Sequence, residues 1–404
     1  MKIDEKERNR HRKRLQLVAR KTEAKAIEVL GRTINLASPE QVRELLFDEW
    51  GLPWTEENET PSGEASTNRD AVYELMRQAL PQTAQLFLQA LLDYRQAARS
   101  LSKDVEGLEP DHLGRVHPHW HPHSVVTGRL SCSDPQVQNV PDVRDDPDSL
   151  RSMYVAAPGN MLVACDLEQV ELRLVALVIG DREWLDAFAR DEDVHVLNAR
   201  AYFPGVDEIT QSLRTFAKTV TYMYLYGGEA EMACTQMRRV KDANSGRRPY
   251  AKMKLEEARD ARLALLKRHP LEAWWKSSLK DFTRNKCRKT LVLGRKRFFR
   301  DVRSASGSEG LNEIANFEIQ GTVGDLMGGS GAAGKVMAEI PFEGRFGPGI
   351  IQHGHDSLVV EVKKQYAEHA QEVLKSSMST SISYEGRSIA IPAKAKIGKR
   401  WSEV

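Results

Sequence analysis

Asn160–Gly180 reads NMLVACDLEQVELRLVALVIG, an apolar run followed by a polar turn and a second apolar segment. The first part, Asn160–Asp166, is typical of a short, buried β-strand. The second part, EQVELRLVALVIG, has the apolar spacing of a helix that ends at a glycine. A charged residue in an apolar strand is costly to bury unless it is paired or binds a metal ion. Asp166 is therefore the first candidate for a functional residue.

A second carboxylate lies within an apolar strand pattern, GIIQHGHDSLVVEV at Gly349–Val362. Two apolar runs joined by a polar centre predict a β-hairpin, with Asp356 close to its turn. If Asp166 and Asp356 lie side by side, they offer oxygen ligands to a pair of divalent ions of the kind that catalyses phosphoryl transfer. The alternative is structural, because aspartates at strand ends often cap or turn the chain.

The segment between these two patterns contains LRTFAKTVTYMYLYGG at Leu213–Gly228. Arg214, Lys218, Tyr222 and Tyr226 recur every fourth residue, which places them along one face of a helix. Two cations followed by two aromatic rings suit a ligand with a triphosphate at one end and a base at the other. A surface helix whose aromatic half lies in the core is the structural alternative.

The chain as a whole has 404 residues, of which 41% are hydrophobic and 29% charged, with a formal net charge of +2. This composition is typical of folded domains, and the length allows two to four of them. The charge is uneven, because Arg238–Arg303 carries 22 basic and 7 acidic residues and Met1–Thr33 carries 11 and 5. Such blocks are typical of polyanion binding, although solvated helix faces give the same pattern.

Several classes are excluded by simple features of the sequence. No apolar run approaches the roughly 18 residues that span a bilayer. The four cysteines are far apart, which argues against a disulfide framework, and we interpret Cys165 as a small buried hydrophobe. Helical spacing predicts helices over 15–31, 71–102 and 366–378, and Ser38 with Pro39 predicts the start of another. One closing strand is expected near 389–397.

Three of these segments resemble the motifs of the family A DNA polymerases, the bacterial DNA polymerase I type. DLEQVELR at Asp166–Arg173 is similar to motif A, Arg214–Gly227 is similar to motif B, and HDS at His355–Ser357 stands where motif C has HDE. Four further blocks match in order: TGRLSCSDPQVQNVP at 127–141, DVHVLNARAYF at 193–203, NFEIQGTVGD at 316–325, and IPAKAKIGKRW near the end. The resemblance runs from about residue 15 to the C-terminus.

This resemblance implies an α+β, right-hand polymerase fold. A helical thumb would occupy residues 1–110, a palm built on an antiparallel sheet 111–180 and 305–404, and helical fingers 181–304. Because the thumb-like helices begin near residue 15, we expect no 3′–5′ exonuclease domain and no proofreading. Such an exonuclease-deficient build suggests a phage, prophage or accessory repair and gap-filling enzyme in the cytoplasm of a bacterial or phage-infected cell.

The resemblance also implies the reaction, in which a nucleotidyltransferase adds dNTPs to a primer 3′-hydroxyl on a DNA template. Asp166, Asp356 and the backbone carbonyl of Leu167 would hold two Mg²⁺ ions, for which Mn²⁺ could substitute. One ion would lower the pKa of the primer hydroxyl, and the other would neutralise the triphosphate. Expected partners are primer-template DNA, dNTPs and other replication proteins, and we expect a monomer without membrane contact.

Further roles carry over to individual side chains. Lys218 would act in catalysis and, with Arg214, would bind the phosphates of the incoming nucleotide. The remaining nucleotide-binding candidates are Tyr222, His195, Gln169 and Glu171. The template and primer candidates are Tyr226, Gly227, Arg129, Asn316, Gln320 and His355. Glu171 would fill the space of a ribose 2′-hydroxyl and thereby select deoxynucleotides.

The sequence departs from the family pattern at a few positions. Leu167 and Glu168 replace Tyr and Ser, Ser357 replaces the motif C glutamate, and Gly354 stands where a β-branched residue is common. Ser357 leaves open a catalytically weak or silent nucleic-acid-binding accessory protein. An RNA polymerase or reverse transcriptase is the alternative among enzymes. Five histidines at 112, 117, 119, 121 and 123 could bind a metal, but a strand beside DNA explains them better.

Overall fold

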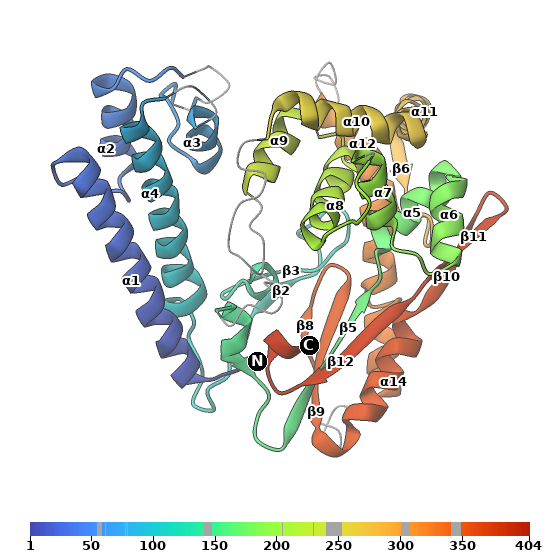
Figure 1. The fold of residues 1–404 in the computed structure, drawn as a ribbon. Helices are drawn as coiled ribbons and strands as arrows, with labels where there is room; N and C mark the ends of the chain where they lie inside the picture. Colours follow the sequence, from blue (N-terminus) through green and yellow to red (C-terminus); the bar gives the residue numbers. More distant parts are fainter. Residues whose placement is uncertain are drawn as a thin grey trace. The chain divides into compact units, whose positions relative to one another are not determined.

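The computed structural model describes residues 1–54, 59–60, 62–76, 78, 80–140, 148–203, 205–228, 230–239, 253–299, 308–340 and 349–404. The chain divides into two compact units (Figure 1). The helical unit comprises residues 2–117 and 148–154, and the sheet unit comprises Met1 with residues 118–147 and 155–404. Helices and strands both contribute, which agrees with the predicted α+β class.

The helical unit is built on two long helices that pack against each other, α1 (Glu5–Leu30) and α4 (Gln82–Arg99). Shorter helical segments complete it: α2 (Pro39–Arg43), η1 (Glu44–Glu49), α3 (Arg69–Leu75), η3 (Ser100–Glu106) and η5 (Leu150–Met153). Leu45, Phe87 and Leu91 lie in its fully buried core. Burial of such side chains contributes about 1.5–3 kcal/mol each.

Helix α1 begins ten residues before the predicted start at residue 15. Asp4 caps it by accepting hydrogen bonds from the backbone N–H groups of Lys6 at 3.0 Å and Glu7 at 3.2 Å. Arg8 is buried, but its guanidinium donates to the carbonyls of Val105 and Leu108, so its charge does not interrupt the helix. The Asp4 cap and the hydrogen bonds of Arg8 thus allow the helix to begin at Glu5. Its first turns are too polar to be recognised from apolar spacing.

Of two further predictions about helix bounds, one is confirmed and one is wrong. Ser38 caps α2 by accepting from the Gln41 N–H at 3.3 Å, and Pro39 is its first residue, as predicted. The single helix predicted over 71–102 is wrong, because α3 and α4 are separate and Pro81 precedes α4. Proline lacks the N–H that a continuous helix would need.

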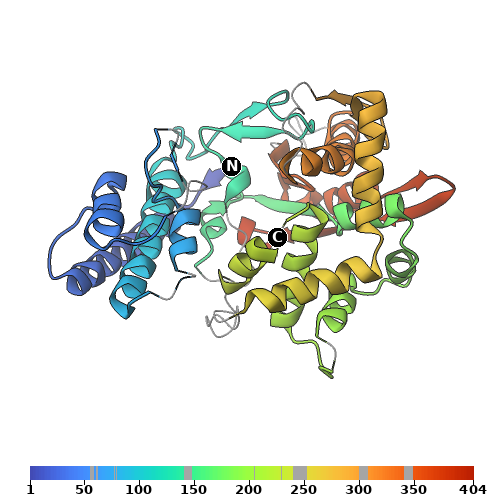
Figure 2. The same ribbon diagram turned by 90° about the horizontal axis from the view of Figure 1, so that it is seen from above.

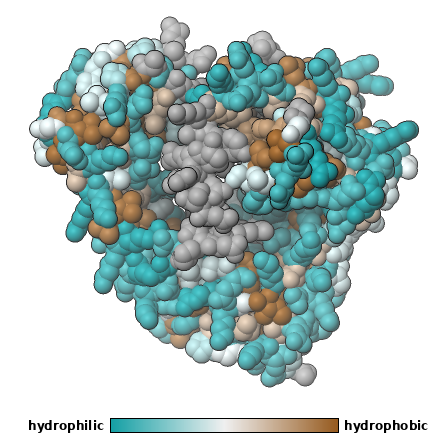
Figure 3. Space-filling model, viewed as in Figure 1, coloured by the Kyte–Doolittle hydropathy of each residue, from teal (hydrophilic) through white to brown (hydrophobic). Residues whose placement is uncertain are grey.

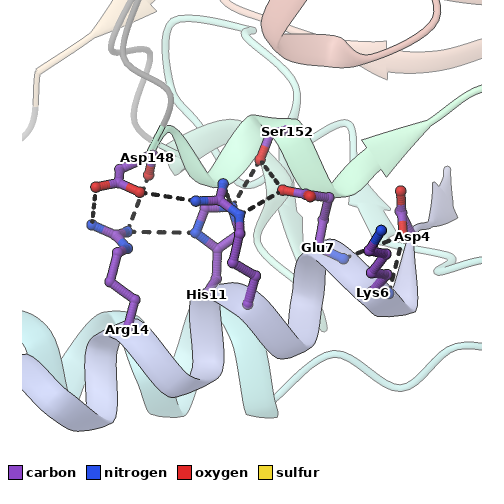
Figure 4. Close-up of polar contacts among 8 residues, drawn as sticks. Asp4, Lys6, Glu7, His11, Arg14, Asp148 and Ser152 are labelled. Atoms are coloured by element: carbon purple, nitrogen blue, oxygen red, sulfur yellow. Dashed lines mark hydrogen bonds and ion pairs between the residues drawn. The ribbon is translucent and has the colours of Figure 1, made fainter.

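A polar network joins α1 to Asp148 and to η5 within the helical unit (Figure 4). His11 is fully buried, and its Nε2 lies 2.8 Å from Ser152 Oγ. Arg10 and Arg14 lie beside the ring, and both pair with Asp148, at 3.0 and 3.5 Å. Burial and these two arginines lower the pKa of His11 to about 4, although Glu7 and Asp148 act in the opposite direction.

We expect this unit to lose stability as the pH falls from about 6.5 to about 4. Over that range the unfolded chain binds a proton at His11 and the folded chain does not, so the free energy of unfolding decreases with falling pH. His11→Gln removes the titrating group and should flatten this part of the profile. Urea unfolding of both proteins at several pH values measures the difference, and parallel profiles would contradict the assignment.

The sheet unit is centred on four antiparallel strands in the order β12–β5–β9–β8. Their bounds are β5 Asn160–Leu167, β8 Gly349–His353, β9 Ser357–Lys363 and β12 Ala393–Gly398. The predicted buried strand and hairpin are therefore confirmed. The single closing strand predicted near 389–397 is wrong, because Pro392 separates β11 (Arg387–Ile391) from β12.

In Figure 1 most helices of this unit lie above and beside the sheet, and Figure 2 shows the same elements from above. Helix α14 (Ala367–Met378) packs against β5 and β12. The others are α5 (Val170–Ile179), α6 (Arg182–Ala189), α7 (Val194–Tyr202), α8 (Gln211–Leu225), α9 (Ala230–Arg239), α10 (Leu255–Arg268), α11 (Leu271–Asn285), α12 (Ser308–Met327) and α13 (Ala332–Glu339). One hydrophobic core runs from the sheet into these helices.

Three small hairpins complete the sheet unit: β2 (His119–His121) with β3 (Ser131–Ser133), β6 (Cys287–Lys289) with β7 (Lys296–Phe298), and β10 (Thr380–Tyr384) with β11. The four cysteines are buried and none forms a disulfide. Among the helices that the structure describes, none is long and apolar enough to cross a membrane. On the face drawn in Figure 3, hydrophobic atoms form separate small patches within a hydrophilic surface.

Candidate active site

Two aspartates meet where β5 and β9 run side by side. Asp166 on β5 is paired in register with Ser357 on β9, the residue after Asp356. The backbone N–H of Leu167 donates to the carbonyl of Asp356 at 2.9 Å, which fixes the two segments together. Both aspartates are accessible to solvent. The structure thus brings together the two carboxylates that the sequence places almost two hundred residues apart.

Gly354 and Ser357 are two of the departures from the family pattern, and they lie in contact in the turn between β8 and β9. The Gly354 N–H donates to the Ser357 carbonyl at 2.7 Å and closes the turn between β8 and β9. A Cβ atom at Gly354 would lie 2.1 Å from Ser357 Oγ and 3.3 Å from the Ser357 carbonyl oxygen. A β-branched side chain therefore does not fit at position 354 in this turn unless Ser357 moves.

The extra negative charge at Glu168 is neutralised locally. Lys394 on β12 lies opposite Asp166 in register, and its Nζ is 2.5 Å from Glu168 Oε1. This ion pair raises the pKa of Lys394. Glu168 and Lys394 together carry no net charge, so Glu168 adds little negative charge beside Asp166.

Acidic and basic side chains surround Asp356. Burial by surrounding protein atoms, followed by the negative charge of Glu171, raises the pKa of Asp356, whereas Arg129 and Lys218 oppose the shift. Although the residue is accessible to solvent, its carboxylate is crowded enough to be partly dehydrated. The raised pKa means that this setting favours the neutral acid, and a bound cation would favour the carboxylate instead.

Helix α8 presents the predicted stripe to this site. Thr210 caps it by accepting from the Leu213 N–H at 3.3 Å. Lys218 is exposed and Tyr222 is half-buried, and both line a hollow of about 430 Å³ beside α9. Burial, Glu171 and Asp356 raise the pKa of Tyr222, so its hydroxyl stays protonated. Phe216, Val220 and Tyr224 form the buried face of the same helix, which confirms its amphipathic character.

His195 stands beside the stripe on α7. Asp193 caps this helix through the His195 N–H at 2.9 Å and accepts from Arg214 Nε at 2.5 Å. Burial alone would raise the pKa of Asp193, but the arginine outweighs it and the pKa is lowered. Burial and the charges of Lys218 and Arg214 lower the pKa of His195 to about 4, against the effect of Asp193. The imidazole is therefore neutral near pH 7.

Glu171 on α5 is held by two partners. Its Oε1 accepts from Arg129 Nη2, and its Oε2 accepts from the hydroxyl of Tyr226, the residue that follows α8. Burial and the negative charge of Glu171 raise the pKa of Tyr226. Because both carboxylate oxygens are occupied, the side chain has a defined position between α5 and the end of α8. This three-residue network was not predicted as such, although each member was.

Several predicted site residues have buried polar atoms without a hydrogen-bond partner among the residues that the structure describes. They are Gln169 Oε1, both ring nitrogens of His195, Asn316 Oδ1 and Arg129 Nε. Buried polar atoms are normally paired, so each of these atoms is a candidate contact for a ligand or a water molecule. Gln320 is half-buried one turn after Asn316 on α12, and His355 is exposed next to Asp356.

The residues that hold this site in place were not identified from the sequence. Arg173, within motif A, is buried and donates to the carbonyls of Glu168 and Ala390, at 2.9 and 3.0 Å. Arg295 donates to the carbonyl of Thr127 at 2.7 Å and pairs with Asp325, which anchors the loop that carries Arg129. Arg173 and Asp325 are charged residues inside matching blocks, whereas Arg295 lies outside every block and carried no such signal.

A buried chain of hydrogen bonds runs from α6 to α8. Trp184 Nε1 donates to Asn198 Oδ1 at 3.1 Å, and Asn198 Nδ2 donates to Thr221 Oγ1 at 3.0 Å. Tyr202 Oη lies 2.9 Å from the same Thr221 oxygen. Thr221 directly precedes Tyr222, so this chain fixes the side of α8 that lies behind the candidate ligand face.

Replacement of Asn198 by leucine is expected to destabilise the sheet unit. The indole of Trp184 loses its acceptor and Thr221 loses a donor, at about 1–3 kcal/mol for each buried group left unpaired. Urea unfolding measures the loss, with Asn285→Leu as the matched control because Asn285 is exposed. Equal stability of the two variants would contradict a structural role for the chain of hydrogen bonds.

The donor set at Asp166 and Asp356 suits a hard divalent cation. Two carboxylates and the nearby carbonyl of Leu167 are oxygen ligands, and Mg²⁺ commonly binds to one or two carboxylates together with substrate phosphates and water. Within the described part of the chain, no group of three or more His, Cys, Asp or Glu side chains could hold a metal ion. The five histidines do not form one; His117 pairs with Asp111 at 2.8 Å and His121 with Ser133 at 2.9 Å.

The sheet with its two aspartates and the facing helix α8 has the arrangement of a nucleic-acid polymerase domain. The model of DNA polymerase family A matches residues 5–403. The chain therefore belongs to DNA polymerase family A.

Individual relatives agree with this assignment. The chain is 31% identical over 391 residues to the thermostable DNA polymerase I of Thermus aquaticus, covering 93% of this chain and 42% of that protein. It is 28% identical to DNA polymerase I of Pseudomonas aeruginosa, covering 94% and 40%. The chain thus spans about two fifths of the length of these curated relatives.

A solved structure matches the whole chain. It is the POL domain of Pol1 from M. smegmatis in complex with DNA primer-template and dNTP, with a TM-score of 0.81 and 25% identity. The match covers 100% of this chain and 67% of that chain. The polymerase-domain fold expected from the sequence is confirmed.

Proposed function

We propose that this chain is a DNA-directed DNA polymerase that adds dNTPs to the 3′-hydroxyl of a primer. One observation carries the proposal: the register of β5 and β9 places Asp166 next to Asp356 in a chain of DNA polymerase family A. Primer-template DNA and dNTP, which the M. smegmatis structure contains, are the proposed ligands of the same site here.

The residues of α7 and α8 bind and orient the nucleotide in this proposal. Lys218 and Arg214 provide positive charge for the triphosphate, and the neutral imidazole of His195 donates an N–H to a phosphate oxygen. Tyr222 packs on the sugar and base, because a half-buried ring with a protonated hydroxyl offers a flat apolar surface. Gln169, whose Oε1 is buried without a partner, accepts from the nucleotide or its water.

The acidic residues set the reaction and its specificity. Asp166, Asp356 and the Leu167 carbonyl hold divalent cations, proposed to be two Mg²⁺ ions, which when bound stabilise the triphosphate and lower the pKa of the primer hydroxyl. Glu171 is fixed by Arg129 and Tyr226 and occupies the space of a ribose 2′-hydroxyl. It therefore excludes ribonucleotides by volume, which argues against the RNA polymerase alternative.

The remaining site residues contact the nucleic acid. Tyr226 and Gly227 follow α8 and are placed to receive the template base. Asn316 and Gln320 on α12, with Arg129 and His355, contact the minor groove at the primer end, where correct pairs present acceptors at common positions. Asn316 donates to such an acceptor through its amide Nδ2.

Primer extension with purified protein, Mg²⁺ and four dNTPs tests the proposal. We expect ladders of extended primer that end at the template 5′ terminus. Absence of extension together with retained DNA binding would instead support the silent accessory protein that Ser357 left open. Parallel reactions with rNTPs and with an RNA template test the RNA polymerase and reverse transcriptase alternatives.

A further inference from the structure

Helix α11 has a basic face that the candidate active site does not use. Lys276, Lys280 and Arg284 are exposed and follow one another at four-residue intervals, so they lie along one side of the helix. The opposite side contributes Trp274 and Phe282 to the interior. With Leu279 and Thr283, the three basic residues line an open groove of about 490 Å³. We call Lys276, Lys280 and Arg284 the α11 basic face.

This face is poorly neutralised. Lys276 lies 3.9 Å from Glu272, whereas Lys280 and Arg284 make no ion pair within the described ranges of the chain. The acidic residue between them, Asp281, pairs with Arg288. Residues 276–298 contain nine basic residues and one acidic residue. Three of the nine are neutralised from outside the stretch, because Arg288, Arg295 and Arg297 pair with Glu318, Asp325 and Glu313. Clustered like charges destabilise a folded protein unless an anionic partner offsets them, so the pattern indicates a polyanion.

The position of α11 indicates which polyanion. Trp275 Nε1 donates to the carbonyl of Leu225, the last residue of α8, at 3.3 Å. The next residues of the chain are Tyr226 and Gly227, which are proposed to receive the template base. Lys276 directly follows Trp275, so the α11 basic face begins next to a residue that contacts the end of α8. A template strand that approaches this end of α8 would reach α11 before it is copied.

We propose that the α11 basic face binds phosphates of the unpaired template strand ahead of the primer end. Residues four apart on a helix are about 6 Å apart along its axis, a spacing comparable to that of consecutive phosphates in an extended strand. The groove contains no aromatic ring for base stacking. Binding here is thus electrostatic, independent of sequence and sensitive to salt. This inference rests on the proposed polymerase function.

The test compares DNA binding by the wild type and by the triple variant K276Q/K280Q/R284Q. Two primer-templates are used, one with a long single-stranded 5′ template extension and one with a single unpaired nucleotide. Anisotropy titrations over a range of KCl concentrations give the slope of log K against log salt. This slope is negative, and the loss of three phosphate contacts should reduce its magnitude by roughly 2 on the long extension. The slope on the short extension should not change.

A matched variant controls for the loss of three charges. K335Q/K364Q/K375Q removes three exposed lysines of α13, the turn before α14, and α14 itself, all within the sheet unit. We expect wild-type slopes for it on both substrates. An unchanged slope in the α11 variant, an equal loss on both substrates, or an equal loss in the control would each overturn the proposal.

The same samples separate this inference from the proposed function. Extension of the short substrate by one nucleotide does not require the α11 basic face and should proceed in all three proteins at similar rates. If the wild type does not extend it, the polymerase proposal fails. If extension proceeds but the α11 variant binds the long substrate like the wild type, only the role of α11 is wrong.

Discussion

Asp166→Ala is expected to reduce the rate of nucleotide addition by roughly 10³-fold, equivalent to about 4 kcal/mol of transition-state stabilisation. The carboxylate is adjacent to Asp356 and both are accessible, so its loss removes half of the anionic ligand set for divalent ions. Single-turnover extension of a saturating primer-template measures the effect. DNA binding without nucleotide should be retained, because the residue does not belong to the basic surfaces.

Asp186→Ala is the matched control for this experiment. Asp186 is an exposed aspartate on α6 of the same unit. Its replacement should leave the extension rate within experimental error of the wild type. An Asp166→Ala protein that is folded and extends primers at the wild-type rate would refute the assignment of β5 and β9 as the catalytic strands.

Glu171→Ala is expected to admit ribonucleotides. The ratio of kcat/KM for rNTP to that for dNTP should rise by about 10²-fold, because the volume that excludes the 2′-hydroxyl is removed. The dNTP reaction itself should also slow, since Arg129 and Tyr226 lose the carboxylate that both contact. Single-nucleotide incorporation with matched rNTP and dNTP measures both effects.

Glu171→Gln separates volume from charge. Glutamine keeps the size of the side chain, so ribonucleotides should remain excluded, whereas the ion pair with Arg129 is lost. Glu339→Ala, at an exposed position on α13, serves as the surface control and should change neither ratio. If glutamine admits ribonucleotides as well as alanine does, exclusion depends on charge and the steric account is wrong.

Apolar spacing was sufficient to predict the helices and strands that bury one continuous apolar face. The strand at Asn160–Leu167, the helix at Val170–Ile179 and the β8–β9 hairpin each contain enough apolar residues for their period to be visible. The first turns of α1 could not be predicted in this way, because Arg8 and His11 are buried through polar partners on distant segments. Pro392 also divides an apolar run into two strands that belong to different sheets.

The candidate site was predicted at the level of its individual residues but not of their contacts. Asp166 and Asp356 were identified because carboxylates are conspicuous in apolar strands, and strand pairing then brought them together. The pairing of Glu168 with Lys394 and the bonds of Arg173 to backbone carbonyls were not foreseen. They depend on how β11 and β12 return to β5, which no local pattern specifies. The division into thumb, palm and fingers stays a prediction.

Template-directed addition of a single nucleotide tests the central claim most directly. A primer is annealed to four templates that differ only in the first unpaired base, and each is offered one dNTP at a time with Mg²⁺. The account predicts addition of the complementary nucleotide in each of the four cases and loss of this activity in Asp166→Ala and Asp356→Ala. Addition that ignores the template base, or no addition by a folded wild-type protein that binds the DNA, would contradict it.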